Sequence, residues 1–254
     1  MDTIKIIEVN PENVREQTFF CIKDIRKPEF ENKRKWFKKT FKEGLRIKIL
    51  RDQTDRPIAF IEYVPAEFAW RPVDADNYMF IHCMYVHSNK DKKKGYGSML
   101  VKACEDEARE KNMLGVITMT SKGSWVADKR LFEKMGFVEA EKIDRFELLI
   151  KKFDTNSPNP KLIDWTKNQK NYIGWHLLYA DQCPWNEKSA LALKETAKEY
   201  GIDLQIKKID SVQQAKAAPS GFAVFNLLHD GKLLEDHYLS QTRFKNIVKK
   251  ELGL

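Results

Sequence analysis

The apolar residues of the first 153 positions follow helical and strand periods, and together they predict a mixed α/β sheet covered by helices. Residues 78–86 are almost wholly apolar, which is typical of a central strand with both faces buried. Apolar spacing predicts helices over 11–26, 28–44 and 97–111. Other strands are predicted at 3–9, 45–50, 57–64, 115–120 and in two runs over 137–153, with a short helix ending at Gly136.

A polar, proline-bearing stretch divides the chain. We predict a first domain over residues 1–153, a linker over 154–170 and a second, smaller α/β domain over 171–254. In the second domain the pattern predicts strands at 174–179, 204–209, 222–228 and 232–237, and helices at 187–200 and 240–252. Asp230-Gly231 predicts a hairpin turn between the last two strands, and Ser240 an N-cap.

Composition narrows the classes of function. The chain has 254 residues, of which 42% are hydrophobic and 32% charged, and no run approaches the roughly 18 apolar residues that a membrane helix needs. Its start lacks the apolar core of a signal peptide. Four scattered cysteines without a Cys-x-x-Cys pair predict neither a disulfide framework nor a metal site. We therefore expect a cytoplasmic protein that binds no membrane.

The net charge of +8 leaves nucleic acid, acidic surfaces and phosphorylated small molecules as partners. No aromatic–basic recognition motif accompanies it, so we do not expect nucleic acid. A lysine-rich run lies between the strand at 78–86 and the helix at 97–111, just before Gly95 and Gly97; it reads Lys90-Asp91-Lys92-Lys93-Lys94. The start of a helix offers unpaired N–H groups and a positive dipole end, so this loop is a candidate phosphate site. A tight turn with solvated lysines is the alternative.

The stretch resembles motif A of the GNAT superfamily of N-acetyltransferases, Arg/Gln-x-x-Gly-x-Gly/Ala, with Lys92, Gly95 and Gly97 at the matching positions. A lysine stands at the first position, and the loop is one residue longer than usual. Leu131-Phe132-Glu133-Lys134-Met135-Gly136-Phe137 resembles the family's Leu-Tyr-Glu-Lys-x-Gly-Phe element. The resemblance covers about residues 1–152 and implies a GNAT acyltransferase fold that uses acetyl-CoA to acetylate an amine.

The same resemblance implies the cofactor-binding residues. Backbone groups of Met84, Tyr85 and Val86 would pair with the pantetheine arm of acetyl-CoA, and the amides from Lys93 to Ser98 would hold the pyrophosphate. The full set of expected cofactor-binding residues is Met84, Tyr85, Val86, Lys92, Lys93, Lys94, Gly95, Tyr96, Gly97, Ser98 and Phe132. Phe132 replaces the tyrosine that protonates the leaving thiolate in many of these enzymes, so it is expected to pack against the cofactor arm or the core.

No motif in the sequence identifies the catalytic groups, so several residues are candidates. His82 is a candidate base, and strand alternation predicts that it faces away from Cys83, which we expect in the core. Glu67 is a second candidate base, while Ser121 and Ser124 could supply hydroxyl donors. The competing interpretations are a buried structural histidine, an exposed loop glutamate and ordinary loop serines.

The second domain has Cys183-Pro184-Trp185-Asn186 between a strand and a helix, and a helix start favours the thiolate of a cysteine. This arrangement, with Pro219 before a later strand, resembles the thioredoxin-like fold, in which that proline is cis. Asn186 replaces the second cysteine, so Cys183 is a reactive thiol candidate without an intramolecular disulfide partner. The two domains in this order resemble the YoaP-type acetyltransferases of bacteria.

We therefore predict an acetyl-CoA-dependent N-acetyltransferase acting on a small-molecule or peptide amine. Two alternatives stay open: a catalytically silent acyl-CoA sensor, which Phe132 favours, and a monothiol redox or thiol-binding protein built on Cys183. The sequence defines neither the acceptor amine nor the oligomeric state.

Overall fold

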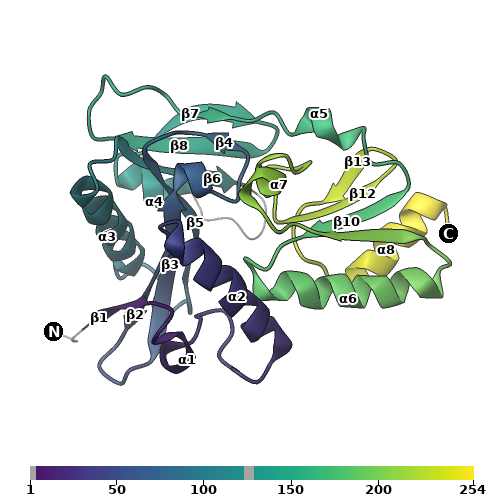
Figure 1. Ribbon diagram of the computed structural model, residues 1–254, viewed down its shortest axis with the longest axis horizontal. Helices are drawn as coiled ribbons and strands as arrows, with labels where there is room; N and C mark the ends of the chain where they lie inside the picture. The colour runs from purple at the N-terminus through teal and green to yellow at the C-terminus, as the bar shows by residue number, and fades with distance from the viewer. Residues whose placement is uncertain (1–3, 123–128) are drawn as a thin grey trace. The chain divides into compact units, whose positions relative to one another are not determined.

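A computed structural model describes residues 4–122 and 129–254, and the chain divides into two compact units (Figure 1). The first unit comprises residues 1–25, 37–69 and 73–162. The second comprises residues 163–254 together with two short earlier segments, 26–36 and 70–72. The second unit thus takes in chain from within the predicted first domain, which no local sequence pattern indicates.

The first unit is built on a seven-stranded sheet in the order β1-β2-β3-β5-β6-β8-β7. Neighbouring strands are antiparallel except β5 and β6, which run parallel at the centre. The strands are β1 (Lys5–Val9), β2 (Arg46–Arg51), β3 (Pro57–Pro65), β5 (Tyr78–Val86), β6 (Gly115–Ser121), β7 (Val138–Ile143) and β8 (Phe146–Lys152). The predicted mixed α/β sheet is confirmed, with each expected strand of the first 153 residues in place.

Helices lie on both faces of this sheet (Figure 1). Helix α3 (Tyr96–Glu110) buries Leu100, Val101 and Cys104 in a core shared with β3, β5 and β6. Helix α2 (Pro28–Lys42) ends on the other side, and the short α4 (Lys129–Lys134) precedes Gly136, whose φ of 83° is the predicted left-handed cap. Parallel β5 and β6 need a crossover, and α3 supplies it.

The predicted helix over 11–26 is wrong. Only α1 (Val14–Gln17) forms, and Thr18 turns the chain with φ of 58°. The carbonyl of Gln17 accepts a hydrogen bond from Arg51 at 3.0 Å, which replaces a helical bond. The turn lets Phe19 pack edge-on against Phe37 in the interior. Burial of this aromatic ring outweighs the helical preference of the local sequence.

The second unit has a four-stranded sheet in the order β11-β10-β12-β13. Strands β10 and β11 are parallel, and the two other pairs are antiparallel. Its elements are β10 (Trp175–Tyr179), α6 (Pro184–Glu199), β11 (Leu204–Lys208), α7 (Val212–Lys216), β12 (Phe225–His229), β13 (Lys232–Glu235) and α8 (Gln241–Leu252). Ser240 caps α8, as predicted: its hydroxyl oxygen accepts a hydrogen bond from the backbone N–H of Arg243.

Several short elements were not predicted. They are the 3₁₀ turn η1 (Ala66–Phe68), a two-stranded pair of β4 (Val73–Asp74) and β9 (Lys161–Leu162), the helix α5 (Thr166–Gln169), and α7. Each has five residues or fewer, too short for a hydrophobic period to be visible in the sequence. Among the described residues, no helix combines the length and apolar character needed to span a membrane.

A partly buried polar cluster joins α3 to the sheet. Glu107 accepts a hydrogen bond from Tyr63 on β3, and its carboxylate lies 3.0 Å from the ammonium of Lys48 and 2.9 Å from that of Lys111. Burial by itself raises the pKa of Glu107, but the hydrogen bonds from Tyr63, Lys111 and Lys48 outweigh it and lower that pKa to about 2. Glu107 is therefore ionised throughout the physiological range.

The depressed pKa of Glu107 predicts a pH-dependent contribution to stability. The pKa of Glu107 in the folded protein, about 2, lies below its ordinary pKa of 4.5. The stabilisation is therefore fully present above pH 4.5 and is lost as the pH falls toward 2. Glu107→Gln should lower the free energy of unfolding at pH 7 by on the order of 2 kcal/mol. Denaturant unfolding of both proteins should show the difference shrinking between about pH 5 and pH 2. The exposed Glu110→Gln is the control; equal changes in both variants would contradict this role.

Candidate active site

The two central strands stop pairing halfway along their length. Strand β5 pairs with β6 only from Tyr78↔Gly115 to Ile81↔Thr118. Beyond that point β5 continues to pair with β3 as far as Val86, and β6 continues to pair with β8 as far as Ser121. The backbone groups of β5 that face β6 after Ile81 therefore have no ladder partner in that strand. An extended ligand could add to this open edge as a strand does.

A β-bulge lies where the two strands separate. Ile81 stands opposite Tyr63 and Cys83 opposite Glu62, so His82 is an extra residue in β5. Ile81 and Met84 consequently both belong to the core beneath α3 although they are three residues apart. The predicted alternation of His82 and Cys83 does not hold through the bulge. Cys83 is exposed, and its predicted place in the core is wrong.

The bulge brings His82 against a buried carboxylate. Its Nδ1 lies 3.5 Å from Oε1 of Glu62 on β3, and Glu62 is only 2% exposed. The imidazole also packs edge-on against Phe80, with ring centroids 5.4 Å apart. A carboxylate beside one ring nitrogen orients a histidine and stabilises its protonated form. His82 thus has the surroundings of a general base at the point where β5 and β6 separate.

The loop between β5 and α3 presents a row of unpaired amides. Within the described part of the chain, no acceptor is bonded to the backbone N–H groups of residues 93–98, whereas the next amide, of Met99, bonds to the carbonyl of Gly95 at 3.0 Å. Lys93 and Gly95 have left-handed φ values of 63° and 83°. Left-handed residues in such a turn can bring successive amides toward one side, and the dipole of α3 adds positive potential at its start. Unbonded amides at the start of a helix are a suitable site for an anion.

The two glycines of the loop serve different purposes. Gly95 is the N-cap of α3 in the left-handed conformation, and a Cβ placed on it would meet no atom within 4 Å. Gly97 is buried, and a Cβ there would lie 3.0 Å from Leu131 and 3.5 Å from Met84. Gly95 therefore leaves open space beside the amides, while Gly97 allows the first turn of α3 to pack closely on α4 and β5.

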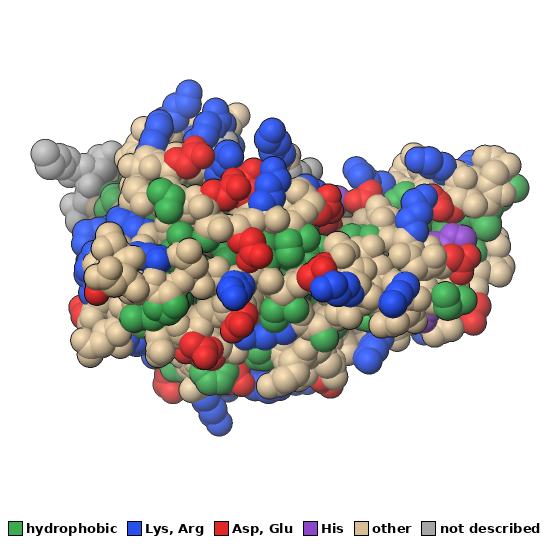
Figure 2. Space-filling model, turned by 90° about the horizontal axis from the view of Figure 1, so that it is seen from above, with side chains coloured by type: hydrophobic (Ala, Val, Ile, Leu, Met, Phe, Trp, Pro, Cys, Tyr) green, Lys and Arg blue, Asp and Glu red, His purple; other side chains and the backbone are tan. Residues whose placement is uncertain are grey.

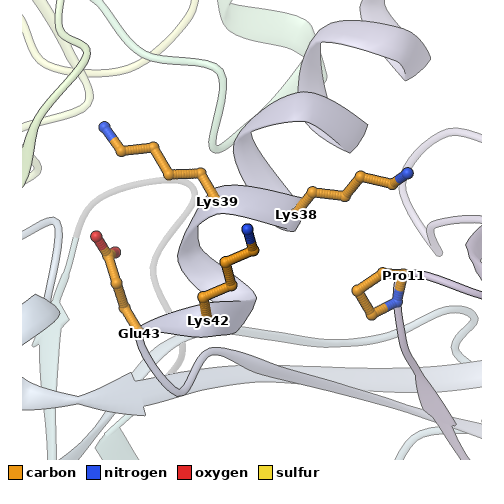
Figure 3. A pocket seen from close by; sticks show the side chains of 5 residues that line it. All are labelled: Pro11, Lys38, Lys39, Lys42 and Glu43. Atoms are coloured by element: carbon orange, nitrogen blue, oxygen red, sulfur yellow. The ribbon is translucent and has the colours of Figure 1, made fainter.

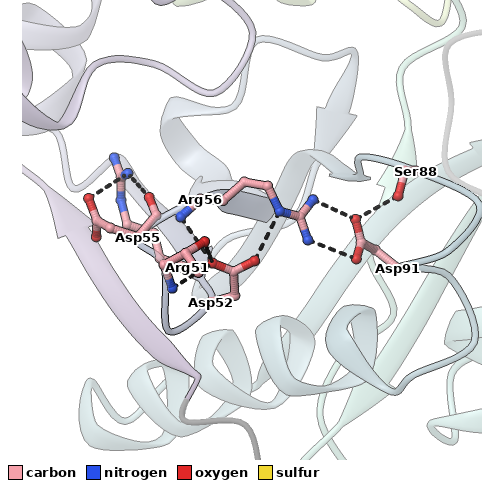
Figure 4. Close-up of polar contacts among 7 residues, drawn as sticks. Arg51, Asp52, Asp55, Arg56, Ser88 and Asp91 are labelled. Carbon is pink, nitrogen blue, oxygen red and sulfur yellow. Dashed lines mark hydrogen bonds and ion pairs between the residues drawn. The ribbon is translucent and has the colours of Figure 1, made fainter.

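An ion pair fixes the loop to the neighbouring hairpin (Figure 4). Asp91 is 3% exposed, and its two oxygens accept bonds of 3.0 and 3.1 Å from Arg56 and one of 2.6 Å from Ser88. The hydrogen bonds from Arg56 and Ser88 hold the pKa of Asp91 well below its usual range. Arg56 is itself oriented by Asp52 at 2.9 Å. The bidentate pair restrains the loop whose amides follow at residues 93–98.

The lysines around these amides point outward. Lys92, Lys93 and Lys94 are exposed, and Lys92 donates to Asn89 at 3.2 Å. Tyr96 is half-buried against the core, and Ser98 is half-buried in the first turn of α3. Tyr85 is half-exposed on β5 beside Phe20, with ring centroids 6.1 Å apart. Exposed ammonium groups beside these unbonded amides raise the positive potential around the loop.

The remaining sequence candidates lie in other surroundings. Phe132 is 0% exposed and packs edge-on against Phe137, so its position is explained by core packing; contact with a cofactor stays a prediction. The carboxylate of Glu67 in η1 accepts a hydrogen bond of 2.7 Å from the backbone N–H of Asn77, just before β5 begins. Ser121 at the end of β6 accepts a hydrogen bond from Arg145. Ser124 lies outside the described residues.

In the second unit, Cys183 is the half-buried N-cap of α6. The Asn186 amide nitrogen donates to the carbonyl oxygens of Ala180 at 3.1 Å and Val224 at 2.8 Å, so this fully buried side chain joins β10 to the segment before β12. Two buried cations, Lys33 and Arg71, donate to the carbonyl and side-chain oxygens of Gln182. The Ala218–Pro219 bond is trans, unlike the bond in the resembled fold.

A separate hollow of about 530 Å³ lies beside the end of α2 (Figure 3). It is lined by Pro11, Lys38, Lys39, Lys42 and Glu43, and contains none of the residues described above. Burial raises the pKa of Glu43. Acidic and basic side chains are interspersed over the face in Figure 2, and the described residues hold no group of three or more metal-ligating side chains. The candidate active site is therefore the region between β5 and β6, which combines the open strand edge with His82, Glu62 and the unbonded amides.

Sequence reasoning missed several residues of this site. Glu62 is a lone charged residue within the apolar run 58–64, which was a usable signal because an isolated carboxylate in a central strand needs a partner. Thr118 and Thr120 are likewise polar residues in an apolar strand, and both are buried. The Arg56–Asp91 pair joins residues 35 positions apart and had no local signal.

Residues 12–137 match the acetyltransferase (GNAT) family. A curated relative, the N-acetyltransferase YoaP of Bacillus subtilis (strain 168), itself uncharacterized, is 27% identical over an alignment of 248 residues. The alignment covers 95% of this chain and 97% of the relative.

Among solved structures, an N-acetyltransferase of Staphylococcus aureus Mu50 covers 63% of this chain and 99% of its own, with 13% identity and a TM-score of 0.41. A GNAT family acetyltransferase of Brucella melitensis, solved in complex with acetyl-CoA, covers 63% and 95%, with 11% identity and a TM-score of 0.39. The family match places the similarity to GNAT acetyltransferases in residues 12–137.

Proposed function

We propose that this protein transfers an acetyl group from acetyl-CoA to an amine at the site between β5 and β6. The observation that carries the proposal is the set of amides from residue 93 to residue 98, which lack acceptors in the described chain at the start of α3. A diphosphate needs several converging donors and positive potential, and this loop offers both. The open edge of β5 continues from the loop and can pair with the amide-bearing pantetheine arm.

The residues fit this substrate in chemistry and in space. Gly95 leaves an open volume beside the amides, so a phosphate can approach the backbone. Lys92, Lys93 and Lys94 surround the loop with mobile positive charge, and the Arg56–Asp91 pair restrains the loop before ligand arrives. Restraint of a binding loop lowers the entropy lost on association. Acetyl-CoA supplies the activated acetyl group as a thioester.

His82 is the proposed general base. An amine must lose its proton to attack a thioester, and the imidazole lies at the point where the paired section of β5 and β6 ends. Glu62 orients the ring and stabilises the imidazolium that proton uptake creates. Glu67 remains a weaker proposal because its carboxylate already accepts the amide of Asn77.

The first experiment is calorimetric titration with acetyl-CoA, combined with release of free thiol across a broad panel of amines. Binding with turnover supports the enzyme, and binding without turnover across the panel supports the alternative of an acyl-CoA sensor. Phe132 favours that alternative because its side chain cannot protonate a leaving thiolate. Absence of acetyl-CoA binding would overturn both.

Gly95→Val is expected to weaken binding of acetyl-CoA by about tenfold or more, because the left-handed backbone costs a β-branched residue roughly 1–2 kcal/mol. The new side chain also enters the open volume beside the amides. Isothermal titration measures the change. Gly201→Ala, at another left-handed position with no atom near its Cβ, is the control and should leave affinity unaltered. Equal affinities for Gly95→Val and wild type would show that the ligand lies elsewhere.

His82→Gln is expected to lower kcat by about a hundredfold, the typical contribution of a general base, with affinity for acetyl-CoA changed by less than about twofold. Glu62→Gln should lower kcat less, because it leaves the base in place. Steady-state kinetics and titration together measure both effects. His176→Gln, in β10, is the matched histidine control. Parallel losses of kcat and affinity in His82→Gln would indicate a packing role instead.

We further propose that the second unit is thioredoxin-like and that Cys183 carries a thiol function. The sheet order β11-β10-β12-β13, with a parallel first pair, supports this proposal, as does the place of Cys183 at the start of the 16-residue helix α6. The buried Asn186 bridges two backbone carbonyls. Its replacement of a second cysteine limits the unit to monothiol chemistry.

A thiolate favoured by the start of α6 predicts rapid alkylation of Cys183. Its apparent pKa should fall below the ordinary value of about 8.5. Site-resolved mass spectrometry after iodoacetamide pulses at pH values from about 5 to 10 gives this pKa, with the half-buried Cys21 as internal control. A midpoint at or above the ordinary value would remove the thiol function and leave Cys183 as a structural residue.

A further inference from the structure

The point where β5 and β6 separate is closed by a side chain. Thr118 and Ile81 form the last pair of the parallel ladder, and the Thr118 hydroxyl donates a hydrogen bond of 3.2 Å to the carbonyl oxygen of Ile81. This bond adds to the ladder at its final position. After it, β6 continues through residues 119–121 with β8 as its strand partner.

Thr120 repeats the same side chain two positions further along β6. Successive residues of a strand point to opposite faces, so Thr118 and Thr120 share one face of the sheet. Thr120 is 1% exposed, and its Oγ1 has no hydrogen-bond partner in residues 4–122 and 129–254. A buried hydroxyl without a partner opposes folding. Retaining one beside the open edge of β5 indicates that a ligand supplies its partner.

The same face of the sheet packs against Phe132, the residue that replaces the proton-donating tyrosine of the resembled family. Val116, two positions before Thr118, packs in the core that includes Phe132. Phe132 stands where the resemblance places the tyrosine hydroxyl that serves the leaving thiolate, and its ring offers no donor. Thr120 therefore supplies a buried hydroxyl on the side of the sheet where that donor is absent.

We propose that the Thr120 hydroxyl is a catalytic hydrogen-bond donor to the sulfur of acetyl-CoA. The inference rests on the proposed acetyltransferase function and names the group that assists departure of the thiolate. The open edge of β5 and the amides that begin α3 would align an extended thioester between β5 and β6. The thioester sulfur would then lie in the region where the Thr120 hydroxyl is available to donate a hydrogen bond.

The chemistry balances without loss of a proton from Thr120. The amine nitrogen forms a bond to the acetyl carbon, the carbon–sulfur bond breaks, and its electron pair remains on sulfur. The amine proton passes to His82. The threonine hydroxyl keeps its proton and stabilises the thiolate by a charge-assisted hydrogen bond. Because a thiol has a pKa near ~8.5, hydrogen-bond assistance is sufficient and full protonation in the transition state is not required.

The test compares Thr120→Val, which keeps the shape and removes the hydroxyl, with Thr120→Ser, which keeps the donor. Thr120→Val should lower kcat by about tenfold or more and leave the KM for acetyl-CoA within about twofold. Thr120→Ser should retain kcat within about threefold. The melting temperature of ligand-free Thr120→Val should equal or exceed that of wild type, because a buried unpartnered hydroxyl is removed.

Binding of coenzyme A provides a readout independent of turnover. Wild-type affinity for coenzyme A should rise between about pH 7 and pH 9.5 as the thiolate forms, and Thr120→Val should lose this rise. Thr118→Val is the matched control: it removes the bond to Ile81 and should lower the melting temperature, unlike Thr120→Val.

Two results would overturn the proposal: unchanged kcat in Thr120→Val, or a loss of kcat that Thr120→Ser does not restore. A wild-type protein that binds no acetyl-CoA would remove the proposed function and this inference with it. Wild-type turnover with fully active Thr120→Val would remove the inference alone.

Discussion

The interruption of hydrogen bonding between β5 and β6 is the constraint on which the candidate active site depends. The two strands pair for four residues and then each keeps only its outer neighbour. A sheet normally satisfies its backbone groups internally, so an unpaired edge at the centre of a seven-stranded sheet is costly unless something else binds there. The bulge at His82, the hydroxyl of Thr118 and the buried Glu62 all lie at this point. The surrounding structure thus gathers polar groups where the two strands separate.

The loop that follows β5 likewise leaves backbone groups without partners, here at the start of α3. Six amides lack acceptors in the described chain, and the backbone that presents them includes two left-handed residues, one of them a lysine. The loop is restrained by the bond network of Asp91 with Arg56 and Ser88. An ion pair with a buried aspartate can fix a highly basic, exposed segment that has little else to bury. In the function proposed above, backbone donors would hold the anion and the lysines would add charge around it.

The second unit shows how residues that fail to match an expected motif acquire structural roles. Asn186 occupies the position at which a redox motif would have a second cysteine, and it uses its amide to join Ala180 to Val224. Gln182, just before Cys183, is held by two buried cations from distant parts of the chain. These contacts order the segment around the thiol. They also explain why the unit includes residues 26–36 and 70–72.

The sequence by itself determined the long elements and the loop chemistry, because hydrophobic period, helix caps and glycine positions are local properties. The central strand at 78–86, the helix predicted over 97–111, and the glycines after the lysine run could all be located in advance, the helix to within one residue at each end. Only the tertiary structure decided how β5 bulges at His82, why the chain turns at Thr18 instead of continuing a helix, and which distant partners Asp91, Glu62 and Gln182 acquire. The physical reason is that these features depend on pairing across strands and on burial of side chains far apart in sequence, and neither leaves a periodic mark in the chain.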